Sequence, residues 1–299
     1  MWQARHVAAL LHKQGMETEL LPIETSGDRK LDVTLSKIGE KGLFTMELEE
    51  LLLAGKAHLA VHSAKDMPGT LPEGLEIIAF SHRENPADVL VSFNKSLRLQ
   101  DAGIRIGTSS TRRIAMLKRH APEAQPITIR GNLQTRFRKM KEGSCDAMLL
   151  ARAGVIRMGF EEYITEELAT SIFTPVPGQA SLAIEVAETL DPVLKSAIRS
   201  AVNDLSSELA ISAERSFLRQ MEGGCSIPVF ALCMPDDAGN FQLDAGIVSL
   251  DGSKEIRRCI TIPRIDSGKP DAFRIAGEAL ASEVLKAGGS AILSAIRCS

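Results

Sequence analysis

The spacing of hydrophobic positions changes several times along this 299-residue chain. Helices are predicted where apolar residues recur every three or four positions: residues 2–14, 47–54, 135–143, most of 181–220, and 272–287. Strands are predicted where short apolar runs stand between turn residues: residues 18–23, 58–63, 146–150, 229–234, 241–250, 255–262 and 291–296. Helices and strands that alternate in this way predict an α/β chain.

One succession of predicted elements occurs twice in the chain. A helix that begins near a threonine, Thr45 or Thr135, ends at a glycine and leads into a short apolar strand that closes on small residues. The repeat favours two related α/β units with ligand groups at the carboxyl ends of strands, although chance similarity is an alternative. Pro- and Gly-marked segments at 82–86 and 173–179 predict two crossings between the units, and hence a hinged cleft. Residues 36–44, rich in Gly and Lys, predict a loop.

Length and composition narrow the protein class. A chain of this length is expected to form two or three domains, and the predicted division is residues 1–82 with 181–202, residues 87–177, and residues 203–299. With 44% hydrophobic and 24% charged residues, no bilayer-length apolar run and no signal pattern at the start, the chain is expected to be cytoplasmic. Five cysteines without a CxxC pair predict neither a disulfide framework nor a metal site.

The most unusual segment is basic within an acidic chain. Residues 105–140 contain nine Lys/Arg and one acid, whereas the whole chain has a formal net charge of −3. Arginines stand beside hydroxyl, amide and glycine residues in GTSSTRR (107–113) and RGNLQTR (130–136). Because guanidinium groups match carboxylates or phosphates, this setting predicts a site for several anionic groups. A solvated basic helix face is the alternative.

Two further motifs contain reactive side chains. In VHSAKDMP (61–68), Asp66 and Lys65 follow a predicted strand, where Asp66 suits proton transfer or stabilisation of a developing cation. A turn aspartate with a solvated lysine is the alternative. In EGGC (222–225), two glycines precede Cys225, which predicts an exposed thiol whose pKa the nearby Arg215 and Arg219 lower. A buried structural cysteine is the alternative.

Taken in order, these motifs resemble the porphobilinogen deaminase (hydroxymethylbilane synthase) family of tetrapyrrole biosynthesis. The resemblance rests on KGLF (41–44), VHSAKDMP, GTSS with two arginines, RGNLQTR, PGQ (177–179) and EGGC, which span nearly the whole chain. It implies two domains of the type-II periplasmic-binding-protein architecture around a hinged cleft, plus a smaller α+β domain. It also implies a transferase that joins four porphobilinogen molecules into hydroxymethylbilane and releases ammonia.

The resemblance further implies a cofactor and a set of site residues. A dipyrromethane group is expected on Cys225 through a thioether, and Asp66 is expected to be catalytic. The cofactor carboxylates are expected to be held by Lys65, Thr108, Ser109, Ser110, Arg112, Arg113, Arg130 and Gly131. The substrate is expected to be held by Gln3, Lys37, Lys41, Arg136, Arg157 and Gln179. The implied partner is the small-molecule substrate, without nucleic acid or membrane, and the implied state is a monomer.

Two departures from the family qualify this expectation. Family members carry an N-terminal stretch before the position of Trp2 that forms the first strand of domain 1 and ends in Thr-Arg-x-Ser. Because this sequence begins at Met1-Trp-Gln, domain 1 is predicted to be destabilised and catalysis impaired. The family also has Gly-Gln-Gly-Ala where this chain has GQAS (178–181). Ala180 is expected not to take the positive φ that glycine can, so a hinge that relies on positive φ would be altered.

Three alternatives to an active enzyme remain at this point. An inactive, N-terminally shortened paralogue that binds polypyrroles would retain the fold. A solute-binding protein would share the hinged architecture, but would carry a signal peptide and would not need Asp66 or Cys225. A nucleic-acid binder would use residues 105–140, but aromatic residues make up only 4% of the chain, so platforms for base stacking are scarce.

Overall fold

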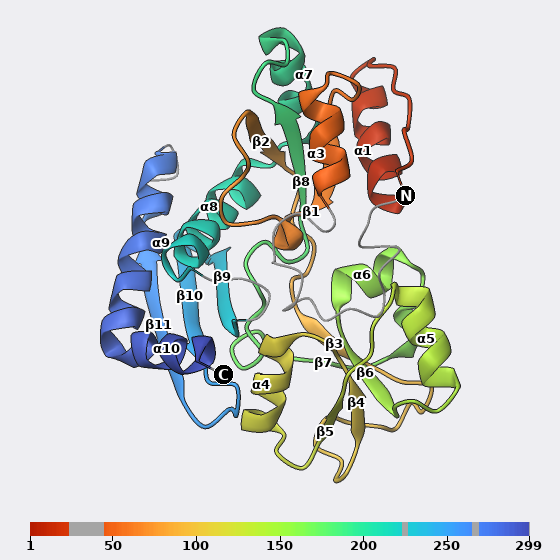
Figure 1. The fold of residues 1–299 in the computed structure, drawn as a ribbon, viewed down its shortest axis with the longest axis vertical. Coiled ribbons are helices and arrows are strands. Elements are labelled where there is room, and N and C mark those ends of the chain that lie inside the picture. Colours follow the sequence, from red (N-terminus) through yellow and green to blue (C-terminus); the bar gives the residue numbers. More distant parts are fainter. Residues whose placement is uncertain (24–44, 223–226, 265–268, 299) are drawn as a thin grey trace.

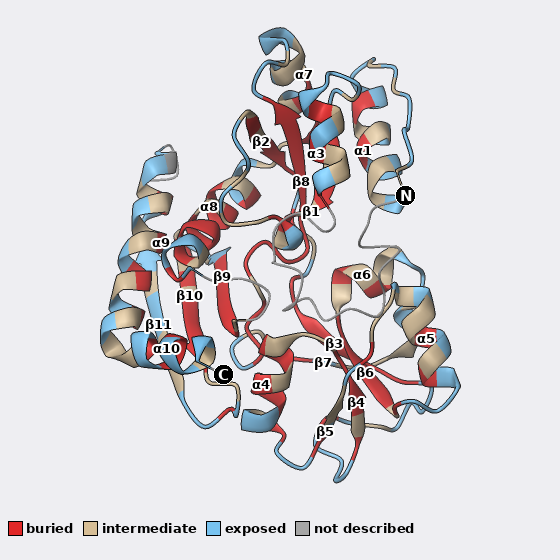
Figure 2. Cartoon of the chain, in the orientation of Figure 1, coloured by how far each residue is buried: buried red, intermediate tan, exposed pale blue. Residues whose placement is uncertain are grey.

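The computed structural model describes residues 1–23, 45–222, 227–264 and 269–298, and its described part contains three β-sheets, each with its own helices (Figure 1). Buried residues follow the sheets and the inner helix faces (Figure 2). Two sheets belong to α/β units, and the third belongs to a smaller α+β unit. This architecture confirms the predicted fold class.

The first unit has a three-stranded sheet in the order β1-β8-β2, with β1 at Ala60–Ser63, β2 at Leu75–Phe80 and β8 at Leu182–Ala187. The central strand β8 is antiparallel to both neighbours. Helices α1 (Trp2–Lys13) and α7 (Pro192–Val202) pack on one face through a core that contains Val7, Ile184 and Val202. Helix α3 (Met46–Leu53) contacts all three strands.

The second unit has five strands in the order β5-β4-β6-β3-β7. Its strands are β3 (Asp88–Val91), β4 (Arg105–Gly107), β5 (Gln125–Ile127), β6 (Ala147–Ala151) and β7 (Ile164–Glu167). Strand β4 is parallel to β5 and β6, whereas β3 is antiparallel to β6 and β7. The helices are α4 (Thr111–His120), α5 (Leu133–Lys141), α6 (Arg152–Arg157) and the single turn η3 (Glu161–Tyr163).

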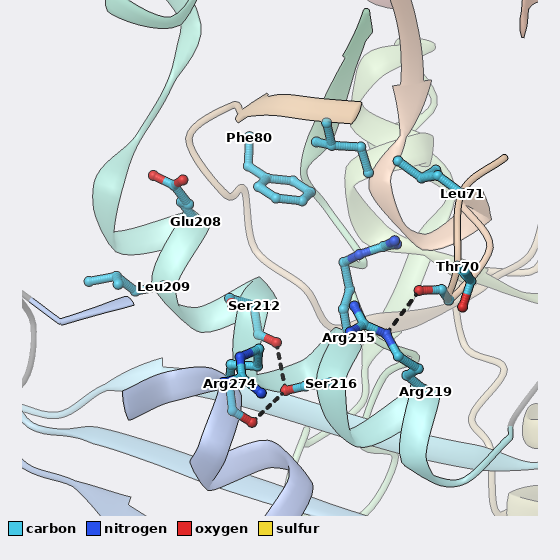
Figure 3. A pocket seen from close by; sticks show the side chains of 12 residues that line it. Thr70, Leu71, Phe80, Glu208, Leu209, Ser212, Arg215, Ser216, Arg219 and Arg274 are labelled. Atoms are coloured by element: carbon cyan, nitrogen blue, oxygen red, sulfur yellow. Dashed lines mark hydrogen bonds between the residues drawn. The ribbon is translucent and has the colours of Figure 1, made fainter. Parts of the chain in front are cut away.

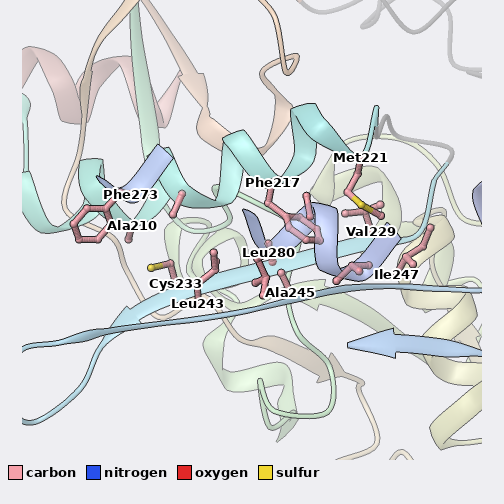
Figure 4. Packing of buried hydrophobic residues seen from close by; sticks show 14 of the residues in the cluster. Ala210, Phe217, Met221, Val229, Cys233, Leu243, Ala245, Ile247, Phe273 and Leu280 are labelled. Carbon is pink, nitrogen blue, oxygen red and sulfur yellow. The ribbon is translucent and has the colours of Figure 1, made fainter. Parts of the chain in front are cut away.

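The third unit is a meander of β9 (Val229–Pro235), β10 (Phe241–Val248) and β11 (Glu255–Ile262), covered by helices. Helix α8 (Leu205–Gln220) lies across the sheet, and Phe217, Leu280 and Leu243 fill the space between them (Figure 4). Helix α9 (Pro270–Val284), the π-turn η5 (Leu285–Gly289) and α10 (Ser290–Arg297) follow.

The last helices form one apolar run, Asp271–Arg297, that is long enough to cross a membrane by length and composition alone. In the structure the run is kinked at Gly288, which has φ +119. Side chains from both sides of the kink, including Leu280 and Ile292, belong to the core that α8 and the β9–β11 sheet share. Packing within the protein therefore accounts for these core residues of the run, whereas Ile275 is 55% exposed.

Three predicted elements are wrong. Residues 182–187 are the strand β8 and not helix, and residues 290–297 are helix and not strand. All six residues of β8 are buried, so its sequence lacks the alternation that identifies a half-exposed strand. Residues 18–23 form no strand, and Leu21 is 56% exposed.

Two predicted helix starts also need correction. Thr45 occupies the N-cap position of α3, but its side chain makes no capping hydrogen bond. Helix α5 begins at Leu133, ahead of Thr135, because the side chain of Asn132 accepts a hydrogen bond from the Thr135 backbone N–H at 2.9 Å. The predicted loop at 36–44 lies outside the described residues.

The two crossing segments meet at one buried ion pair. The guanidinium of Arg83, in the first crossing, donates to both carboxylate oxygens of Glu214 in α8, at 2.5 and 3.1 Å. Glu214 also accepts from the backbone N–H groups of Gly178, in the second crossing, and Cys233, in β9. Arg83 donates in addition to the carbonyl of Gln179. One ion pair thus joins both crossings to the third unit.

Candidate active site

Asp66 lies at the carboxyl end of β1, where the strand tightens into the turn η2 (Ala64–Asp66). The next residue, Met67, is extended at φ −76 and ψ 135, as expected before Pro68. Ala64 and Met67 are buried and anchor the turn, while Asp66 is exposed. The local sequence therefore presents a carboxylate to solvent on a fixed turn.

Opposite this turn, the second unit presents the N-terminus of α4. Strand β4 ends at Gly107, and a Cβ there would lie 2.8 Å from the Ile129 side chain, so a larger residue would require Ile129 and its neighbours to shift. Thr108 is buried, and the Ser110 hydroxyl accepts from the Arg113 backbone N–H at 3.4 Å as the helix N-cap. A helix N-terminus with hydroxyl groups favours negatively charged ligands. Thr108, Ser109 and Ser110 lie together in the loop directly before this helix, so their hydroxyl groups are grouped at its N-terminus.

The side chains of Arg112 and Arg113, in the first turn of α4, both contact Asp88. Asp88 is a fully buried residue at the start of β3. Arg112 Nη2 lies 2.6 Å from Asp88 Oδ2, and Arg113 Nη2 lies 2.7 Å from Oδ1. Gln179 Nε2, from the second crossing, donates to the same Oδ1 at 2.9 Å. Burial opposes ionisation of Asp88, but the two arginines hold its pKa well below the usual range.

The charges of the basic side chains and of Asp66 affect the pKa values in this site. Burial lowers the pKa of Lys65, Asp66 opposes this shift, and Arg113 and Arg112 add to it. Burial also lowers the pKa of Arg136, with Arg113 adding to the shift and Asp66 opposing it. Residues from both α/β units therefore gather around Asp66, and the positive charges outnumber the negative ones.

Arg130 and Gly131 lie in the loop that leads into α5, and Arg136 lies in the first turns of that helix. Gly131 has φ +112, and a Cβ there would approach Thr135 to 2.8 Å, so the position requires glycine. The Gly131 carbonyl accepts from Arg136 Nε at 2.7 Å, while the Arg130 carbonyl accepts from Lys139. The loop thus holds Arg136 while leaving its terminal amino groups for other contacts.

Two predicted substrate residues hold elements of the fold together, one at the end of β1 and the other at the crossings. Gln3, on α1, donates to the Ser63 hydroxyl at the end of β1, at 2.7 Å. Arg157, on α6, donates to Glu84 at 2.9 Å and to the Ala180 carbonyl at 3.4 Å, and its guanidinium carbon lies 5.2 Å from the centre of the Trp2 ring. Arg157 therefore links α6, both crossings and α1.

The basic segment at 105–140 is divided between the site and other contacts. Arg112, Arg113 and Arg136 lie with Asp66, but Arg105 pairs with Asp146 at 2.6 Å. Arg119 and Lys118 contact the turn between β10 and β11, through Glu255 and the Leu250 carbonyl. Part of this positive charge therefore stabilises the fold.

Some predicted residues lie outside the described residues, namely Lys37, Lys41 and Cys225. Asp88 was missed by the sequence reasoning, because a single aspartate between Ala87 and an apolar strand has no motif of its own. The only available signal was its position after Pro86, in the first crossing. In the described part of the chain, no three His, Cys, Asp or Glu side chains group as metal ligands.

Comparison with known proteins agrees with this geometry. Residues 1–195 match the family model described as "Porphobilinogen deaminase, dipyromethane cofactor binding domain", and residues 208–286 match "Porphobilinogen deaminase, C-terminal domain". The chain belongs to the porphobilinogen deaminase family. The family resemblance inferred from the motifs is thereby confirmed, and with it the transferase class and the dipyrromethane-binding domain.

Relatives from other organisms carry the same family name. Porphobilinogen deaminase of Cytophaga hutchinsonii is 50% identical over 298 residues, covering 99% of this chain and 93% of the relative. Porphobilinogen deaminase of Desulfosudis oleivorans is 46% identical, covering 99% and 94%. Among solved structures, the VFT2 domain of Bordetella pertussis BvgS, as a double mutant, is 16% identical with a TM-score of 0.41, covering 72% of this chain and 82% of that domain.

Proposed function

We propose that this chain joins four porphobilinogen molecules head to tail into hydroxymethylbilane, with release of ammonia, as a porphobilinogen deaminase. The observation that supports this most is the grouping of Asp66 with Lys65, Arg113 and Arg136 from two units. Porphobilinogen carries two carboxylates per ring, so a growing chain needs many cationic partners around one acid–base group. The family match favours this enzyme over an inactive paralogue.

The described residues fit a dipyrromethane cofactor. Its carboxylates need charged donors, and Arg112 Nε is a buried donor without a hydrogen-bond partner among the described residues. The hydroxyl-lined start of α4 adds neutral donors at the same place. When bound through a thioether to Cys225, the cofactor would supply the pyrrole carbon to which the first substrate is joined. Arg112, Arg113, Arg130, Lys65 and the 108–110 loop would hold its carboxylates.

Asp66 is proposed to act on the substrate itself. Its carboxylate is exposed on the fixed turn η2, so it can reach the aminomethyl group of a bound porphobilinogen. It would stabilise the positive charge that develops on the substrate methylene carbon as ammonia leaves, because a preorganised carboxylate favours a cation. Arg136 and Gln3 would orient the incoming ring by its side chains, Arg157 and Gln179 would support it from the crossings, and Lys37 and Lys41 would cover it.

The intact mass of the purified protein tests the proposal. We expect the mass to exceed that of the sequence by one dipyrromethane, and the excess to disappear in Cys225→Ser. A matched variant, Cys259→Ser, changes an exposed thiol of the third unit and should keep the excess. An unmodified, folded wild-type chain that produces no hydroxymethylbilane would contradict the proposal.

The remaining proposals concern the organisation of the protein. The three sheets support a division into residues 1–82 with 181–202, residues 87–177, and residues 203–299. We expect a cytoplasmic monomer whose partner is porphobilinogen, without nucleic acid or membrane. Sedimentation equilibrium of the purified protein tests the monomer, since a concentration-dependent mass would contradict it.

A further inference from the structure

A second cluster of arginines lies away from Asp88, in a cavity of ≈ 470 Å³ between the first and third units. One wall is helix α8, from which Arg215 and Arg219 reach toward the segment at Thr70 and Leu71 (Figure 3). The other wall is apolar and contains Leu71, Ile77 and Phe80. The cavity has the volume of a small-molecule site.

Arg215 and Arg219 stand one helical turn apart, on the same face of α8. Like charges at this spacing repel each other and disfavour the helix. Burial lowers the pKa of Arg215 to about 10, and the charge of Arg219 contributes in the same direction. Arg215 is 8% exposed, so its charge is almost fully removed from water.

Neither guanidinium forms an ion pair with a carboxylate in the described ranges. Arg215 Nη2 donates to the Pro68 carbonyl at 2.7 Å, and Arg219 Nε donates to the Gly69 carbonyl at 3.3 Å. Each guanidinium has five N–H groups, so these bonds leave donors of both residues for the cavity. Carbonyl groups do not neutralise the charge, and a buried cation without an ion pair, here Arg215, is costly. Arg219 is exposed at the same cavity.

The other charged residues of the cavity are already paired. Arg274 contacts Asp271 at 3.3 Å and Glu278 at 2.8 Å. Glu208 accepts from Arg199 at 2.6 Å. Arg215 and Arg219 are therefore the charged residues of the cavity that contact no carboxylate among the described residues, while the charge of Glu185 acts on Arg215 without an ion-pair contact.

We propose that this cavity is a second binding site, for a small ring-bearing carboxylate held by Arg215 and Arg219 against Leu71 and Phe80. The guanidiniums match the carboxylate, and the apolar wall matches the ring. The ligand would bridge the segment that follows Asp66 and the helix that leads to residues 223–226. Pyrrole acids and unrelated aromatic acids share this chemistry.

Isothermal titration calorimetry of the intact protein tests the site with four probes: pyrrole-2-carboxylate, benzoate, acetate and inorganic phosphate. Arg219→Gln should weaken binding of the ring-bearing probes about tenfold or more, because it removes charge-assisted hydrogen bonds. Arg274→Gln is the matched control, since Arg274 lines the same cavity but is already paired; it should bind as wild type does. Arg136→Gln removes a cationic group near Asp66 and should leave this component unchanged.

The outcomes separate the possible ligands. Tighter binding of pyrrole-2-carboxylate than of benzoate would identify pyrrole acids as the source, and the reverse would identify other aromatic acids. Equal affinity for phosphate or acetate would overturn the assignment of a ring-bearing ligand. Wild-type affinity in Arg219→Gln would overturn the site.

A second variant tests the site without removing an arginine. Ser212 lines the cavity one turn before Arg215, so Ser212→Asp supplies a carboxylate within the chain. We expect the melting temperature to rise and probe binding to be lost. An unchanged melting temperature together with unchanged probe binding would contradict the proposed lack of a counter-charge.

Discussion

The first and second units share one arrangement of strands, but differ in how far the sheet extends. In the first unit β8 lies antiparallel between β1 and β2, and in the second unit β3 lies antiparallel between β6 and β7. Beyond β6 the second sheet continues with β4 and β5. Among the described residues, β1 has β8 as its one strand partner.

The difference shows what a strand needs besides a suitable sequence. Helix α4 follows β4 and leads to β5, and α1 leads in the same way to residues 18–23. Residues 125–127 form a strand because β4 pairs with them. Residues 18–23 have a similar position and apolar residues at 20 and 21, but no neighbouring strand is described, and Leu20 and Leu21 are exposed. Pairing decides the outcome, as expected when β-propensity depends on context.

The largest effect is expected in the second unit, at Asp88. Asp88→Ala should lower the free energy of unfolding by about 3–5 kcal/mol, because it leaves Arg112 and Arg113 buried without a counter-charge. The matched control is Asp146→Ala, whose partner Arg105 is 42% exposed; it should cost about 1 kcal/mol or less. Urea denaturation measures both. Equal losses would mean that burial does not distinguish the two pairs.

The same carboxylate should make stability depend on pH. The two arginines hold the pKa of Asp88 below its usual value, so the unfolded chain binds this proton at a higher pH than the folded protein does. The stabilisation is therefore complete above about pH 4 and is lost as the pH falls further. Urea denaturation from pH 3 to 7 should show the wild type losing more stability toward low pH than Asp88→Asn. If the free energies of unfolding of the wild type and Asp88→Asn changed equally with pH, Asp88 would not be the source of the pH dependence.

The first unit should respond differently, because its aspartate is exposed. Asp66→Ala should lower the turnover of porphobilinogen by about 10²–10³-fold, as expected on loss of a group that stabilises a transition-state charge. Its free energy of unfolding should change by about 0.5 kcal/mol or less. Rapid quantification of hydroxymethylbilane measures the rate. Retained turnover would remove Asp66 from the proposed chemistry.

A strand added beside β1 would make the two sheets more alike. An N-terminal extension that pairs with β1 should raise the free energy of unfolding by about 2–4 kcal/mol, since each new hydrogen bond contributes ~1 kcal/mol. The control is an extension of equal length with prolines at the pairing positions, which cannot donate to a ladder. Equal free energies of unfolding for the two extensions would show that the added segment does not pair with β1.

The smallest effect is expected at the second crossing between the units. Ala180 has φ +75, a conformation that costs a residue with a side chain roughly 1 kcal/mol or more. Ala180→Gly should therefore stabilise the protein by about 1 kcal/mol or less, after the entropic cost of glycine. Ala183→Gly, in β8, is the matched control and should destabilise it by about 1 kcal/mol. Thermal unfolding measures both changes in stability. If both variants were stabilised, or both destabilised, the backbone φ of the position would not decide the effect.

Local patterns predicted much of this molecule and failed where distant contacts decide. The motif around Asp66 predicted its turn because Pro68 and the apolar strand are neighbours in sequence. The strand β8 was missed because both of its strand partners, β1 and β2, lie more than a hundred residues earlier. Residues 290–297 were mistaken for a strand because their apolar period of three or four is short and follows two glycines.

The candidate site shows the same limit. Sequence alone placed Arg112, Arg113 and Gln179 among ligand-binding residues, but it gave no sign that all three share Asp88. It also treated residues 105–140 as one positive surface. The structure divides them, because Arg105 and Arg119 find acids elsewhere in the fold. Charge counted along a chain does not reveal which charges are already neutralised.

The ion pair of Arg83 and Glu214 has a consequence for how the protein comes apart. Opening either α/β unit, or lifting α8 from its sheet, breaks contacts of the same carboxylate, because Glu214 also binds the backbone of Gly178 and Cys233. The three units are thus energetically linked at one point. Calorimetry is expected to show a single cooperative heat-absorption peak, and Glu214→Gln to split it into separate melting events.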